Sequence, residues 1–262
     1  MEVLHTETGG IDTDKRKVTR REAVRLLHAK AVQVCPSAMG IGHAYAHGYV
    51  EVDNVAYEKQ VWVRYSYKIS KGLWTAWCDL PATYDGPSDH NYDRWHFITE
   101  NVELYSPRGT VEYRFAAFCV VAGHTSWDNN GGNNYVVGVG ENTLLPRVLL
   151  GHDQVILNNA STALQNGKVI FDGSVTVRVH SKSPRVTVIY TCDAWVTIRE
   201  ISVSYAFSIH GYSMEHWVFK AVLDSEVSEI RFAIAYATEE GTFWDNRFGA
   251  DYSVAVPGKV LA

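Results

Sequence analysis

Cysteine is scarce in this chain: four residues in 262 are too few and too irregularly placed for a disulfide framework. Cys35, Cys78, Cys119 and Cys192 do not show the paired spacing of a metal site. They also do not fall at equivalent positions of the internal repeat described below. The sequence therefore predicts free thiols, no bound metal and a reducing, cytoplasmic compartment.

Long apolar runs and an excess of positive charge are missing as well. No stretch is long enough to cross a bilayer, and acidic residues as far as Asp14 interrupt any signal-peptide pattern. The formal net charge of −5 argues against a nucleic-acid-binding face. The sequence also lacks a nucleophile elbow, a phosphate loop and a His-Glu-x-x-His motif. We therefore expect a protein that is not an enzyme, needs no cofactor, and binds neither nucleic acid nor membrane.

What the chain does contain is an internal repeat. Residues 126–135 recur as residues 243–252, with Trp-Asp-Asn at the start of each copy, then a shared Gly and a final Tyr. Other blocks recur in the same order, and the register changes only between blocks, where loops tolerate insertions. Each copy has the length of an independent domain, so the repeat predicts two copies of one domain.

The repeated blocks alternate apolar and polar residues and are rich in Val, Ile, Tyr, Phe and Trp. This pattern predicts antiparallel strands with one buried face. Asp172-Gly173 and the corresponding His47-Gly48 stand where hairpin turns are expected. The predicted fold class is all-β, with two tandem immunoglobulin-like β-sandwiches and a short N-terminal helix.

The helix is predicted at about residues 19–35. A capping box at Thr19–Glu22 precedes an apolar stripe at helical spacing, and Pro36 would end the helix. The expected division of the chain is a leader with this helix at 1–44, copy one at 45–137, a linker at 138–166 and copy two at 167–257. The linker contains an apolar stretch, residues 144–150, which should pack on a domain.

The repeated loop has the composition of a sugar-binding surface. A Trp side chain offers a flat apolar face, Asp and Asn offer donors and acceptors, and Gly allows a tight turn. An alternative is that Asp128 and Asp245 mainly cap the turn through hydrogen bonds to the backbone. The candidate binding residues of the two loops are Trp127, Asp128, Asn129, Asn130, Asn134, Trp244, Asp245 and Asn246.

Residues 54–65, followed by Trp74 and then Trp127-Asp128-Asn129-Asn130, make the chain resemble carbohydrate-binding module family 21. That family includes the starch-binding domain of fungal glucoamylase and glycogen-targeting subunits of protein phosphatase 1. Copy one carries most of the resemblance, and copy two also resembles the starch-binding modules of starch synthase. The resemblance implies binding of α-glucan, such as starch or glycogen, at shallow surface sites.

The resemblance implies two sites in copy one. The first corresponds to Trp74 and Trp127. The second corresponds to Tyr57, Tyr84 and Tyr92, with polar positions at Asn54 and Lys59. In copy two, Trp195 and Trp244 keep the first site, whereas Val179 and Lys182 replace Asn54 and Tyr57, so the second should be lost there.

We therefore predict a non-catalytic, lectin-like protein that recognises α-glucan. One alternative is a glycogen-targeting scaffold that recruits a phosphatase catalytic subunit or another enzyme, and a second is a lectin for other sugars. Lys168-Val169-Ile170-Phe171 matches a short phosphatase-docking motif, but its place in the repeat predicts a paired strand. The sequence leaves the oligomeric state open.

Overall fold

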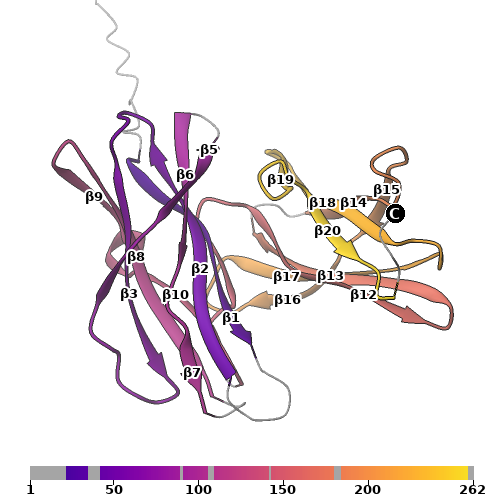
Figure 1. Ribbon diagram of the computed structural model, residues 1–262, viewed down its shortest axis with the longest axis horizontal. Coiled ribbons are helices and arrows are strands. Elements are labelled where there is room, and N and C mark those ends of the chain that lie inside the picture. The colour runs from indigo at the N-terminus through magenta and orange to yellow at the C-terminus, as the bar shows by residue number, and fades with distance from the viewer. Residues whose placement is uncertain are drawn as a thin grey trace, which may run out of the picture.

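The computed structural model describes residues 22–34, 42–88, 91–105, 109–141, 143–179 and 184–258. These residues form four antiparallel sheets, which pack in pairs as two β-sandwiches side by side (Figure 1). The fold is all-β, as the alternating blocks predicted, because strands with one apolar face bury it against a second sheet. We call the N-terminal pair of sheets sandwich one and the C-terminal pair sandwich two.

In sandwich one, the first sheet has the order β11-β1-β2-β6-β5, and β7 also pairs with β2. Its strands are β1 (Val24–Val34), β2 (Gly42–Asp53), β5 (Thr83–Ser88), β6 (Tyr92–Ile98), β7 (Val102–Leu104) and β11 (Val148–Leu150). The second sheet has the order β10-β8-β3-β4, and β9 also pairs with β8. Its strands are β3 (Gln60–Ile69), β4 (Cys78–Pro81), β8 (Val111–Val121), β9 (His124–Asp128) and β10 (Tyr135–Val139).

Sandwich two repeats this arrangement. One sheet has the order β12-β13-β17-β16, with β12 (Val155–Gln165), β13 (Lys168–Arg178), β16 (Ser204–Ile209) and β17 (Met214–Leu223). The other has the order β15-β14-β18-β19, and β20 pairs with β18. Its strands are β14 (Arg185–Thr191), β15 (Arg199–Ser202), β18 (Glu229–Thr238), β19 (Gly241–Asp245) and β20 (Tyr252–Ala255). Strands β1 and β12 therefore hold equivalent places, and so do β9 and β19.

The predicted N-terminal helix is wrong: β1 is a strand, paired with β2 and β11. A β-bulge between Leu26 and His28 moves the buried positions of the strand by one residue. Val24 and Leu26 are buried before the bulge, and Ala29 and Ala31 are buried after it. The resulting three-residue step imitates helical spacing. Residues 19–21 and 35–36 of the predicted helix and its stop signal lie outside the described residues.

The predicted hairpin turns at Gly48 and Gly173 are also wrong, because both glycines lie within strands, β2 and β13. Each faces the bulge of the preceding strand. A Cβ atom on Gly48 would stand 2.4 Å from the carbonyl oxygen of His28, and one on Gly173 would stand 2.4 Å from that of Asn159. Both positions therefore need glycine for close approach of two backbones.

The segments expected to be a leader and a linker contribute strands to the sheets. β1 belongs to sandwich one, and β12 is the first strand of sandwich two. The apolar stretch before β12 packs as predicted, since Val148, Leu149 and Leu150 form β11 and are buried in the core of sandwich one. The two cores are lined by the inward-facing residues of both sheets in each sandwich, with Phe115 and Phe232 at equivalent positions.

Candidate functional site

The repeated loop is held in place by its aspartate. In sandwich one, the Asp128 carboxylate accepts a hydrogen bond from the backbone N–H of Leu26 at 2.7 Å. Leu26 is the residue at which the bulge of β1 begins. The Tyr135 hydroxyl donates to both oxygens of Asp128 at 2.9 Å. Burial, followed by the neighbouring Asp128 carboxylate, raises the pKa of Tyr135. Asp128 therefore ties the loop, β1 and β10 together.

Sandwich two repeats these contacts. Asp245 accepts the backbone N–H of Leu157 at 2.6 Å, again at a bulge, and the Tyr252 hydroxyl donates to it at 2.8 and 2.9 Å. The shared Asp and Tyr of the repeated motif are thus structural residues. Each aspartate also accepts a backbone N–H within its own turn, from Asn130 or Arg247 at 3.3 Å, as the capping alternative predicts.

The other shared polar residues shape the turn. The Asn129 side chain accepts the N–H of Gly132 at 3.0 Å, and Asn246 accepts that of Gly249 at 3.0 Å. Asn130 donates through Nδ2 to the Asn134 carbonyl at 3.1 Å, and both of these residues have positive φ, 53° and 58°. The Asn side chains are therefore engaged in the loop itself. Its tryptophan is the shared residue that points outward.

Trp127 lies on the outer face of the β3–β8–β9 sheet. Its ring is 44% exposed and stacks on Phe118, with ring centroids 4.4 Å apart and planes 27° apart. Phe118 in turn stacks with Trp62 at 6.4 Å. The Arg64 guanidinium lies over Trp127 at 5.1 Å and is held by two bonds to Asp79, at 2.6 and 2.7 Å. The bond from Arg64 lowers the pKa of Asp79.

A second aromatic group lies further along the same face. The Arg114 guanidinium lies 4.4 Å from the centroid of Trp74 and 4.5 Å from that of Trp77. Arg114 and Phe118 both point outward from β8, four residues apart, which is about 13 Å of strand. Trp74 and Trp127 thus belong to one surface, which we call the outer aromatic face, and an arginine lies over each of them.

Sequence reasoning missed several residues of the outer aromatic face: Trp62, Arg64, Trp77, Arg114 and Phe118. Strand alternation could have found Trp62 and Arg64, because they alternate with the buried Val61 and Val63 on β3 and must therefore face outward. The ring contacts of Phe118 with Trp62 and Trp127 depend on the register in which neighbouring strands pair, and sequence alone does not provide that register.

The second predicted site is only partly at the surface. Tyr57 is fully exposed and Tyr84 is half-exposed, packed edge-on against Trp95. Tyr92, however, is only 3% exposed, and its hydroxyl donates to the Glu22 carbonyl. The expectation of Tyr92 as a stacking platform is therefore wrong. The Arg25 guanidinium covers its ring, at 4.1 Å from the ring centroid.

The polar residues of that second site have structural partners. The Lys59 ammonium group is buried and donates to Asp93 at 2.5 Å and to the Asn54 side chain at 2.9 Å. Because Lys59 is committed to this ion pair, it has little freedom to bind a ligand. Asn54 and Tyr57 remain exposed beside it.

In sandwich two, the corresponding outer face is poorer in aromatic side chains. Trp244 is 56% exposed, but its partner across β18 is Ala235, where sandwich one has Phe118. Thr187 and Ile189 stand in the places of Trp62 and Arg64. Trp195 is half-buried at a positive φ of 70°, and its N–H donates to the Thr191 hydroxyl. The loop that carries Trp195 is ordered by Asp193, whose pKa is lowered to about 2 by bonds from Thr197 and Thr191.

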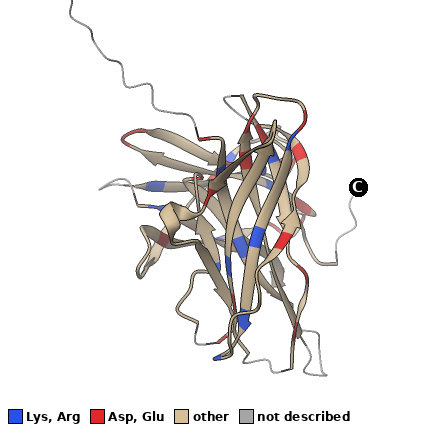
Figure 2. Ribbon diagram, turned by 90° about the vertical axis from the view of Figure 1, so that its left-hand side faces the viewer, with Lys and Arg blue, Asp and Glu red and all other residues tan. Residues whose placement is uncertain are grey.

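Basic and acidic residues are interspersed over the strands and loops (Figure 2). Among the described residues, no cluster of His, Cys, Asp and Glu could hold a metal ion. No helix in the described part of the chain is long and apolar enough to cross a membrane.

Exposed tryptophans on the outer sheet face of an antiparallel sandwich are the kind of surface expected of a carbohydrate-binding module. Residues 28–138 and 149–255 match the carbohydrate/starch-binding module (family 21). These two segments cover most of the chain, so the chain belongs to this family and is a tandem, lectin-like carbohydrate-binding protein. The resemblance seen in the sequence is thus confirmed.

Three known proteins illustrate the similarity. Protein phosphatase 1 regulatory subunit 3C of Xenopus tropicalis is 35% identical over 105 residues, which are 39% of this chain and 43% of that protein. GLC7-interacting protein 2 of Saccharomyces cerevisiae is 34% identical over 107 residues, 35% of this chain and 17% of that protein. The chain thus spans less than half the length of these relatives. The starch binding domain of Rhizopus oryzae glucoamylase, solved with beta-cyclodextrin and maltoheptaose, is 27% identical with a TM-score of 0.32, covering 39% of this chain and 93% of that chain.

Proposed function

We propose that this chain binds α-glucan of the starch or glycogen type, and that the outer aromatic face of sandwich one is its stronger site. The observation that carries the proposal is the exposed Trp127 ring, stacked on Phe118 and flanked by the anchored Arg64. A flat, fixed aromatic face suits the C–H face of a pyranose, and guanidinium groups donate to its hydroxyls. Trp74 and Trp77 extend this surface. Tyr57 and Tyr84, with Asn54, form a second candidate site.

The test is co-sedimentation with glycogen and titration with maltoheptaose. We expect Trp127→Ala to weaken maltoheptaose binding by about 1–3 kcal/mol, on the scale of aromatic stacking on bases. Tyr105→Ala is the control, since Tyr105 is exposed beside β7 on the other sheet. Equal binding by the folded Trp127→Ala variant would contradict the proposal. A glycan array would show whether a different sugar is preferred.

We further propose that each sandwich is a separate domain, and that sandwich two binds more weakly. Its outer face lacks the counterparts of Trp62, Arg64 and Phe118, which supports this ranking. We also propose that the protein has no hydrolytic activity and works in the cytoplasm. The thiol of the buried Cys119, whose pKa is raised by burial, suits a reducing compartment. Reducing sugar released from starch by the purified chain would contradict the absence of hydrolysis.

A second candidate function is recruitment of a phosphatase to glycogen. Sequence identity of 34–35% to phosphatase regulatory subunits favours it. The Lys168–Phe171 motif would not supply the contact as the chain is folded, because Val169 and Phe171 are fully buried in β13 between β12 and β17. A pull-down of protein phosphatase 1 by the chain, unchanged by Lys168→Ala, would support recruitment through another surface.

A further inference from the structure

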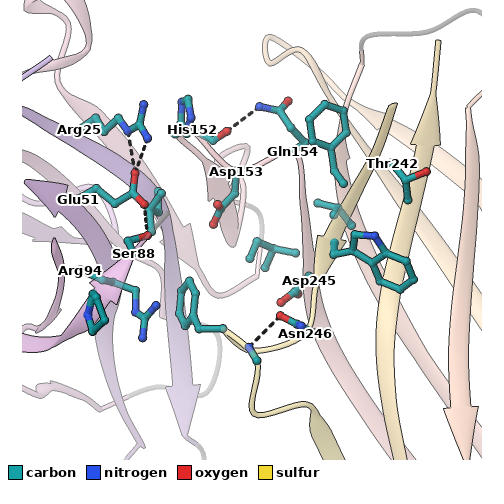
Figure 3. Close-up of a pocket in the computed structure, with 18 residues that line it drawn as sticks. Arg25, Glu51, Ser88, Arg94, His152, Asp153, Gln154, Thr242, Asp245 and Asn246 are labelled. Atoms are coloured by element: carbon teal, nitrogen blue, oxygen red, sulfur yellow. Dashed lines mark hydrogen bonds and ion pairs between the residues drawn. The ribbon is translucent and has the colours of Figure 1, made fainter. Parts of the chain in front are cut away.

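A groove of about 900 Å³ lies between the two sandwiches (Figure 3). Arg25, Glu51, Ser88 and Arg94 line it from sandwich one, and Thr242, Trp244, Asn246 and Phe248 line it from sandwich two. Residues 152–154, in the segment that joins the sandwiches, close one end of it. This volume is within the range of pockets that enclose small ligands.

The wall from sandwich one is a preorganised polar network. Arg25 donates to one oxygen of Glu51 through Nε and a terminal nitrogen, at 2.7 and 2.6 Å, and the Ser88 hydroxyl donates to the other oxygen. Glu51 is only 4% exposed, and the Arg25 guanidinium lies over the Tyr92 ring, 4.1 Å from its centroid. The direction of these polar groups is therefore fixed before any ligand arrives.

The rest of the lining combines a second anchored arginine with aromatic faces. Arg94 donates to the Asp85 carboxylate at 2.7 Å and stacks on the Phe248 ring at 3.8 Å. Trp244 lines the wall from sandwich two and is more than half exposed. Each guanidinium faces a carboxylate, and the pKa of His152 is lowered by burial and then by Arg25. The groove is therefore nearly balanced in charge and suits a neutral, hydroxyl-rich molecule better than an anion.

The contacts that hold the two walls together show that the groove is a fixed feature. Phe248 packs edge-on against Tyr49 of sandwich one at 4.9 Å. The Lys30 ammonium group donates to the Leu157 carbonyl at 2.5 Å, and Arg178 donates to the carbonyls of Leu150 and Gly151. The buried side chain of Met214 belongs to the core cluster of sandwich one.

Phe248 itself is a specific feature of the second copy. It has a φ of 58° and stands where the first copy has Gly131, with a φ of 62°. A bulky residue in the left-handed region is costly, and packing of its ring against sandwich one offsets that cost.

We propose that this groove is a further carbohydrate site, formed jointly by both sandwiches and sharing Trp244 with the face of sandwich two, which holds a short stretch of α-glucan chain. Trp244 stacks on one sugar ring, and Arg25 and Arg94 donate to hydroxyl groups. The choice of α-glucan as the ligand rests on the proposed function. The location of the site rests on the volume and lining of the groove.

The test is calorimetric titration of the full chain with maltoheptaose in a Trp74→Ala/Trp127→Ala background, which removes the outer aromatic face of sandwich one. We expect residual binding. Thr242→Arg fills the groove from an exposed position on β19 and should abolish that binding. Arg25→Lys keeps the positive charge beside Glu51 but loses the several N–H donors of the planar guanidinium group. It should weaken maltoheptaose binding about tenfold. Thr125→Arg is the matched control, because Thr125 holds the equivalent place on β9, away from the groove.

The outcomes separate the two proposals. Residual binding that Thr242→Arg and Arg25→Lys remove, and that Thr125→Arg leaves intact, supports the groove site. The groove site is wrong if the unmodified chain binds maltoheptaose but the Trp74→Ala/Trp127→Ala variant does not. It is also wrong if the residual binding is unaffected by Thr242→Arg and Arg25→Lys. In both cases the proposed function stands. If the unmodified chain binds no maltoheptaose, both proposals fail. Thermal unfolding of each variant confirms that it is folded.

Discussion

Two carboxylates, Asp128 and Asp245, each accept the N–H of a bulged residue in the first strand of their sandwich. We expect Asp128→Ala to lower the free energy of unfolding by about 1–3 kcal/mol, because the buried Leu26 N–H loses its acceptor. Asp245→Ala should cost at least as much, since Asp245 is the more buried of the two. Urea denaturation measures both.

Asp224→Ala is the control for that experiment, since Asp224 is exposed and pairs with Lys168 at the surface. An Asp128→Ala variant as stable as this control would show that the bond to Leu26 contributes nothing. If Asp128→Ala instead weakened sugar binding without lowering stability, Asp128 would be a binding residue.

The shifted pKa of His47 predicts how the stability of the chain changes with pH. Burial, then Lys30, His28 and His96, lower the pKa of His47 from 6.5 to about 4. The unfolded chain therefore binds a proton more readily than the folded chain. His47 stabilises the fold fully above pH 6.5, and this contribution is lost as the pH falls towards 4.

We expect His47→Gln to reduce the fall in the urea midpoint between pH 7 and pH 5. His124→Gln, at an exposed position on β9, should leave the fall unchanged. Parallel profiles for His47→Gln and the unmodified chain would contradict the assignment to His47.

At the scale of elements, the bulges of β1 and β12 are each matched by a glycine on the next strand. A Cβ atom on Gly48 would also lie 2.8 Å from the Phe97 ring, and one on Gly173 would lie 2.5 Å from the Phe219 ring. We expect Gly48→Ala and Gly173→Ala to destabilise the chain by at least about 1–3 kcal/mol, the usual cost of forcing extra volume into a packed site. Gly123→Ala tests positive φ alone, because nothing lies within 4 Å of its Cβ position. If Gly48→Ala costs no more than Gly123→Ala, the close approach is not limiting.

The sequence predicted much at this scale but not the bulges. The repeat predicted equivalent strands because it preserves alternation in blocks such as Val61-Trp62-Val63. The bulge in β1 moves the apolar phase by one residue, so the sequence pattern there predicts a helix. The Asp172-Gly173 dipeptide predicts a turn and, through the repeat, a second turn at Gly48. Leu26, whose backbone N–H binds Asp128, lies far from it in the sequence, so motif composition alone could not separate a structural carboxylate from a ligand.

At the scale of the whole molecule, Phe248 joins the two sandwiches. Phe248→Ala removes its contacts with Tyr49 and Arg94 but keeps a Cβ atom at positive φ. We expect it to destabilise the chain by about 1–2 kcal/mol more than Phe248→Gly does, because glycine relieves the strained backbone. Gly131→Ala, the matched change in sandwich one, should cost about 1 kcal/mol through strain alone. Equal stability of Phe248→Ala and Phe248→Gly, measured by urea denaturation, would show that φ carries no strain here.

If both sandwiches carry a carbohydrate-binding face, as proposed, the chain should bind polymer differently from short sugar. Trp127 and Trp244 lie on β9 and β19, in different sandwiches (Figure 1). A branched glycogen particle can engage both faces, and the second contact then forms at high effective concentration, whereas maltoheptaose binds each face separately. We expect Trp244→Ala to leave the tighter phase of maltoheptaose binding unchanged, yet to weaken glycogen binding by roughly a hundredfold. Titration with maltoheptaose and co-sedimentation with glycogen measure the two effects. A similar, small change in both assays would mean that the two sandwiches bind glucan independently. The interface between the sandwiches would then hold the two faces in an orientation in which one glycogen particle cannot contact both.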